Sequence, residues 1–184
     1  MRTLLCASEI SSLIASLAQQ ILSDAEIAAT PPERLAVVGV RRRGELIAQR
    51  LASIMISKIG QPVALGALDI TMYRDDVVGK RPITIPIGTQ MNFRLDDRVV
   101  ILVDDVLFTG RTIRSAMDAL IDIGRPNTIQ LAVLVDRGHR ELPISADYVG
   151  KNLPTAIKES VVVHLAEVDG TDEILLVEED EGPK

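Results

Sequence analysis

Apolar residues follow two patterns along the chain. In some segments they recur at helical spacing, in others they form continuous runs, and the two kinds of segment alternate. Apolar residues three or four positions apart predict an amphipathic helix at residues 8–23. Largely apolar runs predict strands at residues 35–40, 63–71, 99–103 and 129–135, and the run at 99–103 is apolar throughout, as is typical of a strand buried on both faces. Further helices are expected at residues 44–57 and 112–123. The alternation predicts an α/β fold with a parallel sheet between two layers of helices.

Two regions depart from this alternation. The polar stretch from Met72 to Arg81 is expected to be a mobile excursion, and residues 83–87 are expected to return as an extended edge segment. Near the end of the chain, residues 161–166 and 173–177 are expected to pair as a hairpin around Asp169-Gly170. No repeat or linker divides the 184 residues, so the sequence predicts one domain over residues 1–184, with an acidic tail from about 178 to 184.

The charge of the chain is unevenly distributed. The formal net charge is −6, but residues 1–166 carry 18 acids and 19 bases, a net charge of +1. The charge balance therefore neither indicates nor excludes binding to nucleic acid. Cys6, the single cysteine, excludes an intrachain disulfide, and the sequence has no signal peptide and no apolar stretch of membrane-spanning length. A cytoplasmic protein without membrane contact is expected.

The most informative segment covers residues 98–112. Its apolar strand leads to Asp104 and Asp105, which therefore fall at the carboxyl end of a strand, where open α/β sheets bind ligands. Residues 109–112 then open a helix with free backbone N–H groups, two hydroxyls and a guanidinium, which together suit a phosphate monoester. Carboxylates accept hydrogen bonds from sugar hydroxyls, so the segment indicates a pocket for a ribose 5-phosphate. The alternative is an ordinary acidic turn before a helix.

This ordered set of strand, acids, hydroxyl, glycine, base and hydroxyl resembles the phosphoribosyl pyrophosphate (PRPP) signature of the type I phosphoribosyltransferases. The resemblance implies the type I phosphoribosyltransferase fold, in which a parallel-rich central sheet with flanking helices carries a flexible lid loop and a small hood. It implies that Asp104 and Asp105 hold the ribose hydroxyls. It also implies that the phosphate of PRPP or UMP is bound around these acids by Val106, Thr109, Gly110, Arg111 and Thr112.

Two more segments would complete such a site. Arg41-Arg42-Arg43-Gly44 repeats the order of strand, turn and helix, and the resemblance implies that it is the pyrophosphate loop; an exposed basic turn is the alternative. Arg74 falls where these enzymes carry the lid, and it could neutralise the departing pyrophosphate. An exposed loop of mixed charge is the alternative there. The catalytic residues expected from the resemblance are Asp104, Asp105 and Arg74.

A longer resemblance covers about residues 2–178. Residues 73–76, 99–114, 116–124 and 130–152 are similar to the PyrR family of pyrimidine operon regulators and uracil phosphoribosyltransferases. This implies conversion of uracil and PRPP to UMP and pyrophosphate, with Mg²⁺ carried by PRPP. It also implies binding of pyr messenger RNA leaders that depends on UMP or UTP, and a homo-oligomer is expected. A nucleotide-sensing regulator with little catalysis, or an enzyme for another base, remains the alternative.

Phe108 independently favours a pyrimidine substrate. Purine phosphoribosyltransferases typically carry an acid immediately before the Thr-Gly pair, whereas phenylalanine cannot transfer a proton but can stack on a planar base. The candidate residues of the uracil pocket are Phe108, Val135 and Arg137. The candidates for RNA contact are His139, Arg140 and Lys151, for which a place in the hood or a plain polar loop are alternatives. No protein side chain is assigned to a metal.

Overall fold

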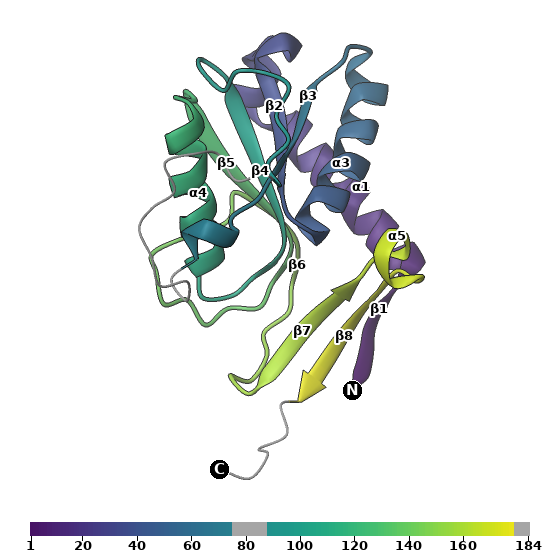
Figure 1. Cartoon of the computed structure of the whole chain (residues 1–184). Helices are drawn as coiled ribbons and strands as arrows, with labels where there is room; N and C mark the ends of the chain where they lie inside the picture. Colours follow the sequence, from purple (N-terminus) through teal and green to yellow (C-terminus); the bar gives the residue numbers. More distant parts are fainter. Residues whose placement is uncertain (75–87, 179–184) are drawn as a thin grey trace.

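The computed structural model describes residues 1–74 and 88–178. Five parallel strands form the central sheet in the order β3-β2-β4-β5-β6 (Figure 1). They are β2 (Leu35–Val40), β3 (Ala64–Leu68), β4 (Val99–Leu107), β5 (Thr128–Asp136) and β6 (Tyr148–Asn152). The predicted parallel sheet is therefore confirmed. The strand expected at residues 63–71 is shorter than predicted, because the chain turns into the 3₁₀-helix η2 (Thr71–Tyr73).

Helices cover both faces of this sheet, as the alternation of the two patterns predicts (Figure 1). Helices α1 (Ala7–Ser23) and α3 (Arg43–Ile59) pack on one face, and α4 (Arg111–Ile123) packs on the other. Two short elements, α2 (Ala25–Ala29) and η1 (Pro32–Arg34), lead from α1 into β2. All six residues of β2 are buried, which explains why its apolar run has no polar alternation.

A second, smaller sheet lies beside the first. Its three antiparallel strands have the order β1-β8-β7, where β1 is Arg2–Cys6, β7 is Glu159–His164 and β8 is Glu173–Glu178. We call these strands, together with the single helical turn α5 (Ala166–Asp169), the hood. The predicted pairing of the last two strands is confirmed, but α5 rather than a tight turn connects them.

The sequence pattern missed two strands, β1 and β6. Both lie at an edge of their sheet and have largely exposed or half-buried residues, so neither needs an apolar run. Most of the excursion expected after Met72, the extended segment at residues 83–87 and the acidic tail beyond Glu178 lie outside the described residues. Within residues 1–74 and 88–178, no helix is both long enough and apolar enough to span a bilayer.

Candidate active site

The carboxyl ends of β2, β3 and β4 meet at one edge of the central sheet, beside a cavity of about 460 Å³. Three segments that the sequence pattern marked separately contribute to its walls: the turn after β2, the polar stretch after β3 and the acids of β4. The lining residues are Val40, Arg41, Arg42, Arg43, Asp69, Ile70, Thr71, Arg74, Asp104, Asp105, Val106 and Thr112. The structure therefore brings the expected pyrophosphate loop, Arg74 and both acids to one cavity.

The two acids of β4 have different surroundings. Asp104 is 5% exposed, whereas Asp105 is half-buried. The backbone N–H of Asp105 donates a hydrogen bond of 3.0 Å to Oδ1 of Asp104. Burial, reinforced by the neighbouring charge of Asp105, raises the pKa of Asp104 well above its ordinary value. A hydrogen-bond donor that reaches this carboxyl is therefore strongly favoured, and ribose hydroxyls are such donors.

Two glycines allow α3 to pack directly behind the acids and the turn. A Cβ at Gly39 would lie 2.4 Å from Cα of Glu45, and a Cβ at Gly44 would lie 2.6 Å from the carbonyl oxygen of Val103. Either methyl group would push the first turn of α3 away from the sheet. The glycines thus keep the N-terminus of α3 and the end of β4 at one cavity.

The three arginines of the expected pyrophosphate loop point in different directions. The backbone N–H of Arg41 donates to the carbonyl oxygen of Leu68 at 2.9 Å, and the peptide bond between Arg41 and Arg42 is cis. The Arg41 guanidinium lies 3.4 Å from the carboxylate of Glu45. Arg42 is exposed, and Arg43 forms an ion pair with Asp169 of the hood.

Residues 106–112 comprise the end of β4, the turn at residues 108–110 and the start of α4. Val106 and Thr112 line the cavity, and Gly110 adopts a φ of 92° at the start of α4. The Thr109 carbonyl oxygen accepts hydrogen bonds from the backbone N–H groups of Glu141 and Leu142. Arg111 donates to the Glu141 carboxylate at 2.6 Å. Residues 141 and 142, which do not line the cavity, therefore fix the turn. The N-terminus of α4 lies at the cavity wall.

Phe108 and Arg137 lie together at the end of β4 and β5. The Arg137 guanidinium is 4.0 Å from the centre of the Phe108 ring, and Arg137 is only 4% exposed. It also donates hydrogen bonds of 3.1 Å to the Thr155 hydroxyl and the Ala156 carbonyl oxygen. Val135, the third candidate for the uracil pocket, is fully buried in the core, so its side chain is not available to a ligand.

The three candidates for RNA contact have different surroundings. Nε2 of His139 lies 2.6 Å from the Thr155 carbonyl oxygen, and the His139 ring meets Phe108 edge-on. Arg140 pairs with Asp136 and donates to the carbonyl oxygens of Phe108 and Ile144, so it braces the loops around the site. Lys151 instead borders a second cavity, which it shares with residues of β1 and α1.

Asp69 is a cavity residue that the sequence reasoning missed. Its Oδ1 accepts hydrogen bonds from the backbone N–H of Thr71 at 2.9 Å and from the Thr71 hydroxyl at 2.6 Å. These two bonds and the charge of Arg41 lower the pKa of Asp69. An aspartate two positions before a threonine at the end of a strand is typical of a turn, and this pattern could have identified Asp69 from the sequence. Asp69 fixes the start of η2, which leads to Arg74.

Comparison with known proteins defines the class to which the fold and cavity belong. Residues 3–167 match the family described as the phosphoribosyl transferase domain. The structure superimposes on the hypoxanthine phosphoribosyltransferase of Trypanosoma cruzi with a TM-score of 0.72, covering 97% of both chains at 19% sequence identity. A hypoxanthine phosphoribosyltransferase from Staphylococcus aureus gives a TM-score of 0.68 over 94% of this chain and 90% of the other, at 20% identity. At these identities the likeness concerns the fold.

Relatives of higher identity narrow the class. A bifunctional protein PyrR from Deinococcus radiodurans is 56% identical and covers 92% of this chain and 91% of its own length. Another, from Corynebacterium glutamicum, is 50% identical over 96% of this chain and 92% of its own. The chain therefore belongs to the phosphoribosyl transferase family and, within it, to the family of bifunctional PyrR proteins.

Proposed function

We propose that this chain transfers the 5-phosphoribosyl group of PRPP to uracil, releasing UMP and pyrophosphate, and that it also binds pyr leader RNA when a uridine nucleotide is bound. The observation that carries the catalytic proposal is the convergence of the pyrophosphate loop, Arg74 and the Asp104-Asp105 pair on one cavity. The proposed domain comprises residues 1–184, acts in the cytoplasm and forms a homo-oligomer.

Each wall of the cavity has a proposed task. Asp104 and Asp105 accept hydrogen bonds from the ribose 2- and 3-hydroxyls, and residues 109–112 with the N-terminus of α4 bind the 5-phosphate. The backbone of residues 41–43 holds the pyrophosphate. Arg74 stabilises the charge that grows on the pyrophosphate as the bond to the ribose breaks. Uracil gives up its N1 proton to the departing pyrophosphate or to water as the bond to the ribose forms. No side chain then has to act as a base, so positioning and electrostatic stabilisation supply the rate enhancement.

Mg²⁺ enters this proposal with the substrate. It prefers oxygen ligands and retains part of its water shell, so the phosphate oxygens of PRPP suit it. In the described part of the chain, no three His, Cys, Asp or Glu side chains are grouped to hold a metal. Asp104 and Asp105 are carboxylates that can face a Mg²⁺ ion carried by PRPP. The ion would neutralise the negative charge of the pyrophosphate.

The proposed base pocket lies beside Phe108. Its ring is covered on one side by the Arg137 guanidinium and meets the His139 ring edge-on. This part of the site combines an aromatic ring with the Arg137 guanidinium, without a carboxylate at position 108. For a purine, the site lacks the acid that purine enzymes typically place at this position. Uracil needs only stacking and hydrogen bonds to its carbonyl oxygens.

The proposal is tested by incubating the protein with Mg²⁺, PRPP and one base at a time. We expect UMP and pyrophosphate from uracil, and far lower rates with orotate, hypoxanthine or guanine. A preference for one of those three bases would overturn the assignment to uracil. Binding of PRPP and UMP without turnover would instead support a regulator that keeps the cavity as a nucleotide sensor.

A further inference from the structure

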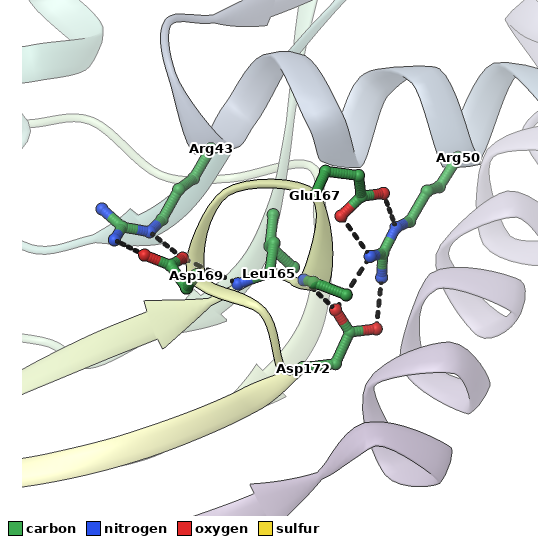
Figure 2. Close-up of polar contacts among 7 residues, drawn as sticks. Arg43, Arg50, Leu165, Glu167, Asp169 and Asp172 are labelled. Atoms are coloured by element: carbon green, nitrogen blue, oxygen red, sulfur yellow. Dashed lines mark hydrogen bonds and ion pairs between the residues drawn. The ribbon is translucent and has the colours of Figure 1, made fainter.

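Two arginines on one face of α3 are bound by acidic residues of the hood (Figure 2). Arg43 and Arg50 are seven positions apart, which places them on the same side of the helix. Arg43 Nη2 lies 3.0 Å from Asp169 Oδ1. Arg50 contacts both Glu167, at 2.6 Å, and Asp172, at 2.7 Å. The short segment that includes α5 therefore reaches α3 at two points.

The acidic partners are themselves fixed by the backbone of the hood. Asp169 Oδ2 accepts a hydrogen bond of 2.9 Å from the Leu165 N–H, and Asp172 Oδ1 accepts one of 2.7 Å from the Ala166 N–H. The side chains of Asp169 and Asp172 are 18% and 12% exposed, but those of Arg43 and Glu167 are 35% and 42% exposed, so solvent still screens these ion pairs in part. The Leu165 N–H thus fixes the Asp169 carboxylate while that carboxylate pairs with Arg43.

The two arginines differ in what they support. Arg43 is the first residue of α3 and the last residue of the pyrophosphate loop, and it lines the active-site cavity. Arg50 lies two turns further along α3 and is not among the residues lining the cavity. Both pairs attach the hood to α3, but only the pair of Arg43 with Asp169 lies at the loop. Glu167 therefore provides a control for Asp169 within the same helical turn.

We infer that Asp169 is a positioning residue for the pyrophosphate loop. By binding the Arg43 guanidinium at the edge of the cavity, it fixes the start of α3, so that the loop backbone presents its N–H groups to the pyrophosphate of PRPP. This inference rests on the proposed function, since it takes the cavity to be a PRPP site. It makes the hood a determinant of PRPP affinity.

The test compares Asp169→Asn with Glu167→Gln in the full chain. Each variant removes one carboxylate charge from α5 without changing the side-chain size. We expect Asp169→Asn to raise the KM for PRPP roughly fivefold, the effect of losing one partly exposed ion pair. The KM for uracil and the affinity for UMP should stay within about twofold of the wild type. Glu167→Gln should leave PRPP kinetics unchanged, and Asp169→Glu should restore them toward the wild type.

A purely structural brace would give a different result. Both neutral variants would then lower the melting temperature and change all kinetic constants alike, which would overturn the inference. Calorimetric titration with PRPP needs no turnover and separates the two hypotheses. If the wild type binds PRPP without making UMP, the proposed activity fails, yet weaker PRPP binding by Asp169→Asn than by Glu167→Gln still supports the positioning role. Equal binding by the two variants refutes it.

Discussion

In the protein without ligand, the role proposed for Asp104 in binding ribose conflicts with the stability of the fold. A carboxylate suits ribose hydroxyls, but this one is almost fully buried next to a second acid, so its charged form is disfavoured. A carboxyl whose pKa is raised in the folded state supports folding at low pH, and that support is lost as the pH rises through the folded-state pKa. In the unfolded chain Asp104 ionises near its ordinary pKa, so the folded state loses stability from that pH up to the folded-state pKa and bears the full cost above it. Function thus keeps a destabilising residue in the site.

Replacing Asp104 with Asn should therefore stabilise the ligand-free protein at pH 7. We expect the melting temperature to rise by roughly 3 °C for each kcal/mol relieved in a domain of this size. Below about pH 4, where Asp104 is protonated in the folded and unfolded states alike, the gain should disappear. Calorimetric melting curves at the two pH values measure the difference. A gain that is equal at both would show that the charge is not its cause.

The double substitution Asp104→Asn with Asp105→Asn should abolish most transferase activity. Each carboxylate lost removes charge-assisted hydrogen bonds worth about 1.5–3 kcal/mol, so kcat/KM should fall by roughly a hundredfold or more. Far-ultraviolet circular dichroism controls for an intact fold. Unchanged kinetics in the folded double variant would exclude the two acids from the reaction.

Arg74→Ala should lower kcat more than it lowers PRPP affinity. If the arginine acts on the charge of the departing pyrophosphate, its effect is greatest in the transition state. Steady-state kinetics with PRPP and a calorimetric titration with UMP, which lacks pyrophosphate, distinguish the possibilities. A matching loss of UMP affinity would identify Arg74 as a general anion contact.

At the scale of elements, the site is assembled by connections between neighbours in the sheet. Arg137, at the end of β5, stacks on Phe108 beyond β4 and donates to the segment that leads into β7. The same guanidinium thereby joins the central sheet to the hood. A lysine cannot both stack in this planar manner and form the two donor contacts.

Arg137→Lys should therefore raise the KM for uracil, by roughly tenfold, because the Phe108 ring loses the guanidinium that fixes it beside the proposed base pocket. The KM for PRPP should change much less, because the pyrophosphate loop lies at the other end of the site. Initial rates with each substrate varied in turn give both constants. A larger effect on PRPP than on uracil would contradict the proposed position of the base.

Sequence patterns predicted the central strands and the terminal pair β7–β8, and missed the two edge strands β1 and β6. The strands β2, β4 and β5 are marked by apolar runs, and the signature acids follow from the end of β4. In contrast, β6 contains the polar residues Lys151 and Asn152, and β1 has only five residues. An edge strand is exposed to solvent along one side, so neither strand needs an apolar run. The pairing of Arg43 with Asp169 is also not predictable locally, since it depends on how the hood docks on α3.

At the scale of the whole molecule, the proposed RNA surface and the nucleotide cavity must be linked. If UMP strengthens binding of pyr leader RNA, RNA must strengthen UMP binding by the same factor. Arg140 is a poor probe of this surface, because its guanidinium braces Asp136 and two backbone carbonyl groups. Lys151 is exposed and is the better position for a test.

Lys151→Ala should weaken RNA binding without altering uracil turnover. Loss of one phosphate contact should reduce the slope of log affinity against log salt by about 0.7 to 0.9. Mobility-shift titrations with and without UMP, at several salt concentrations, measure the slope and the coupling. An unchanged slope would place the RNA elsewhere, and no binding to the pyr leader of the source organism would leave only the catalytic function.

The pairing of β1 with β8 has a consequence for synthesis on the ribosome. Arg2 lies opposite Leu176, whereas every strand of the central sheet is present once Asn152 has been made. The nascent chain can therefore fold its central sheet while β1 still has no neighbour. Asp169 emerges only after that sheet, so we expect newly made chains to acquire the acids of β4 early and the brace on the pyrophosphate loop last.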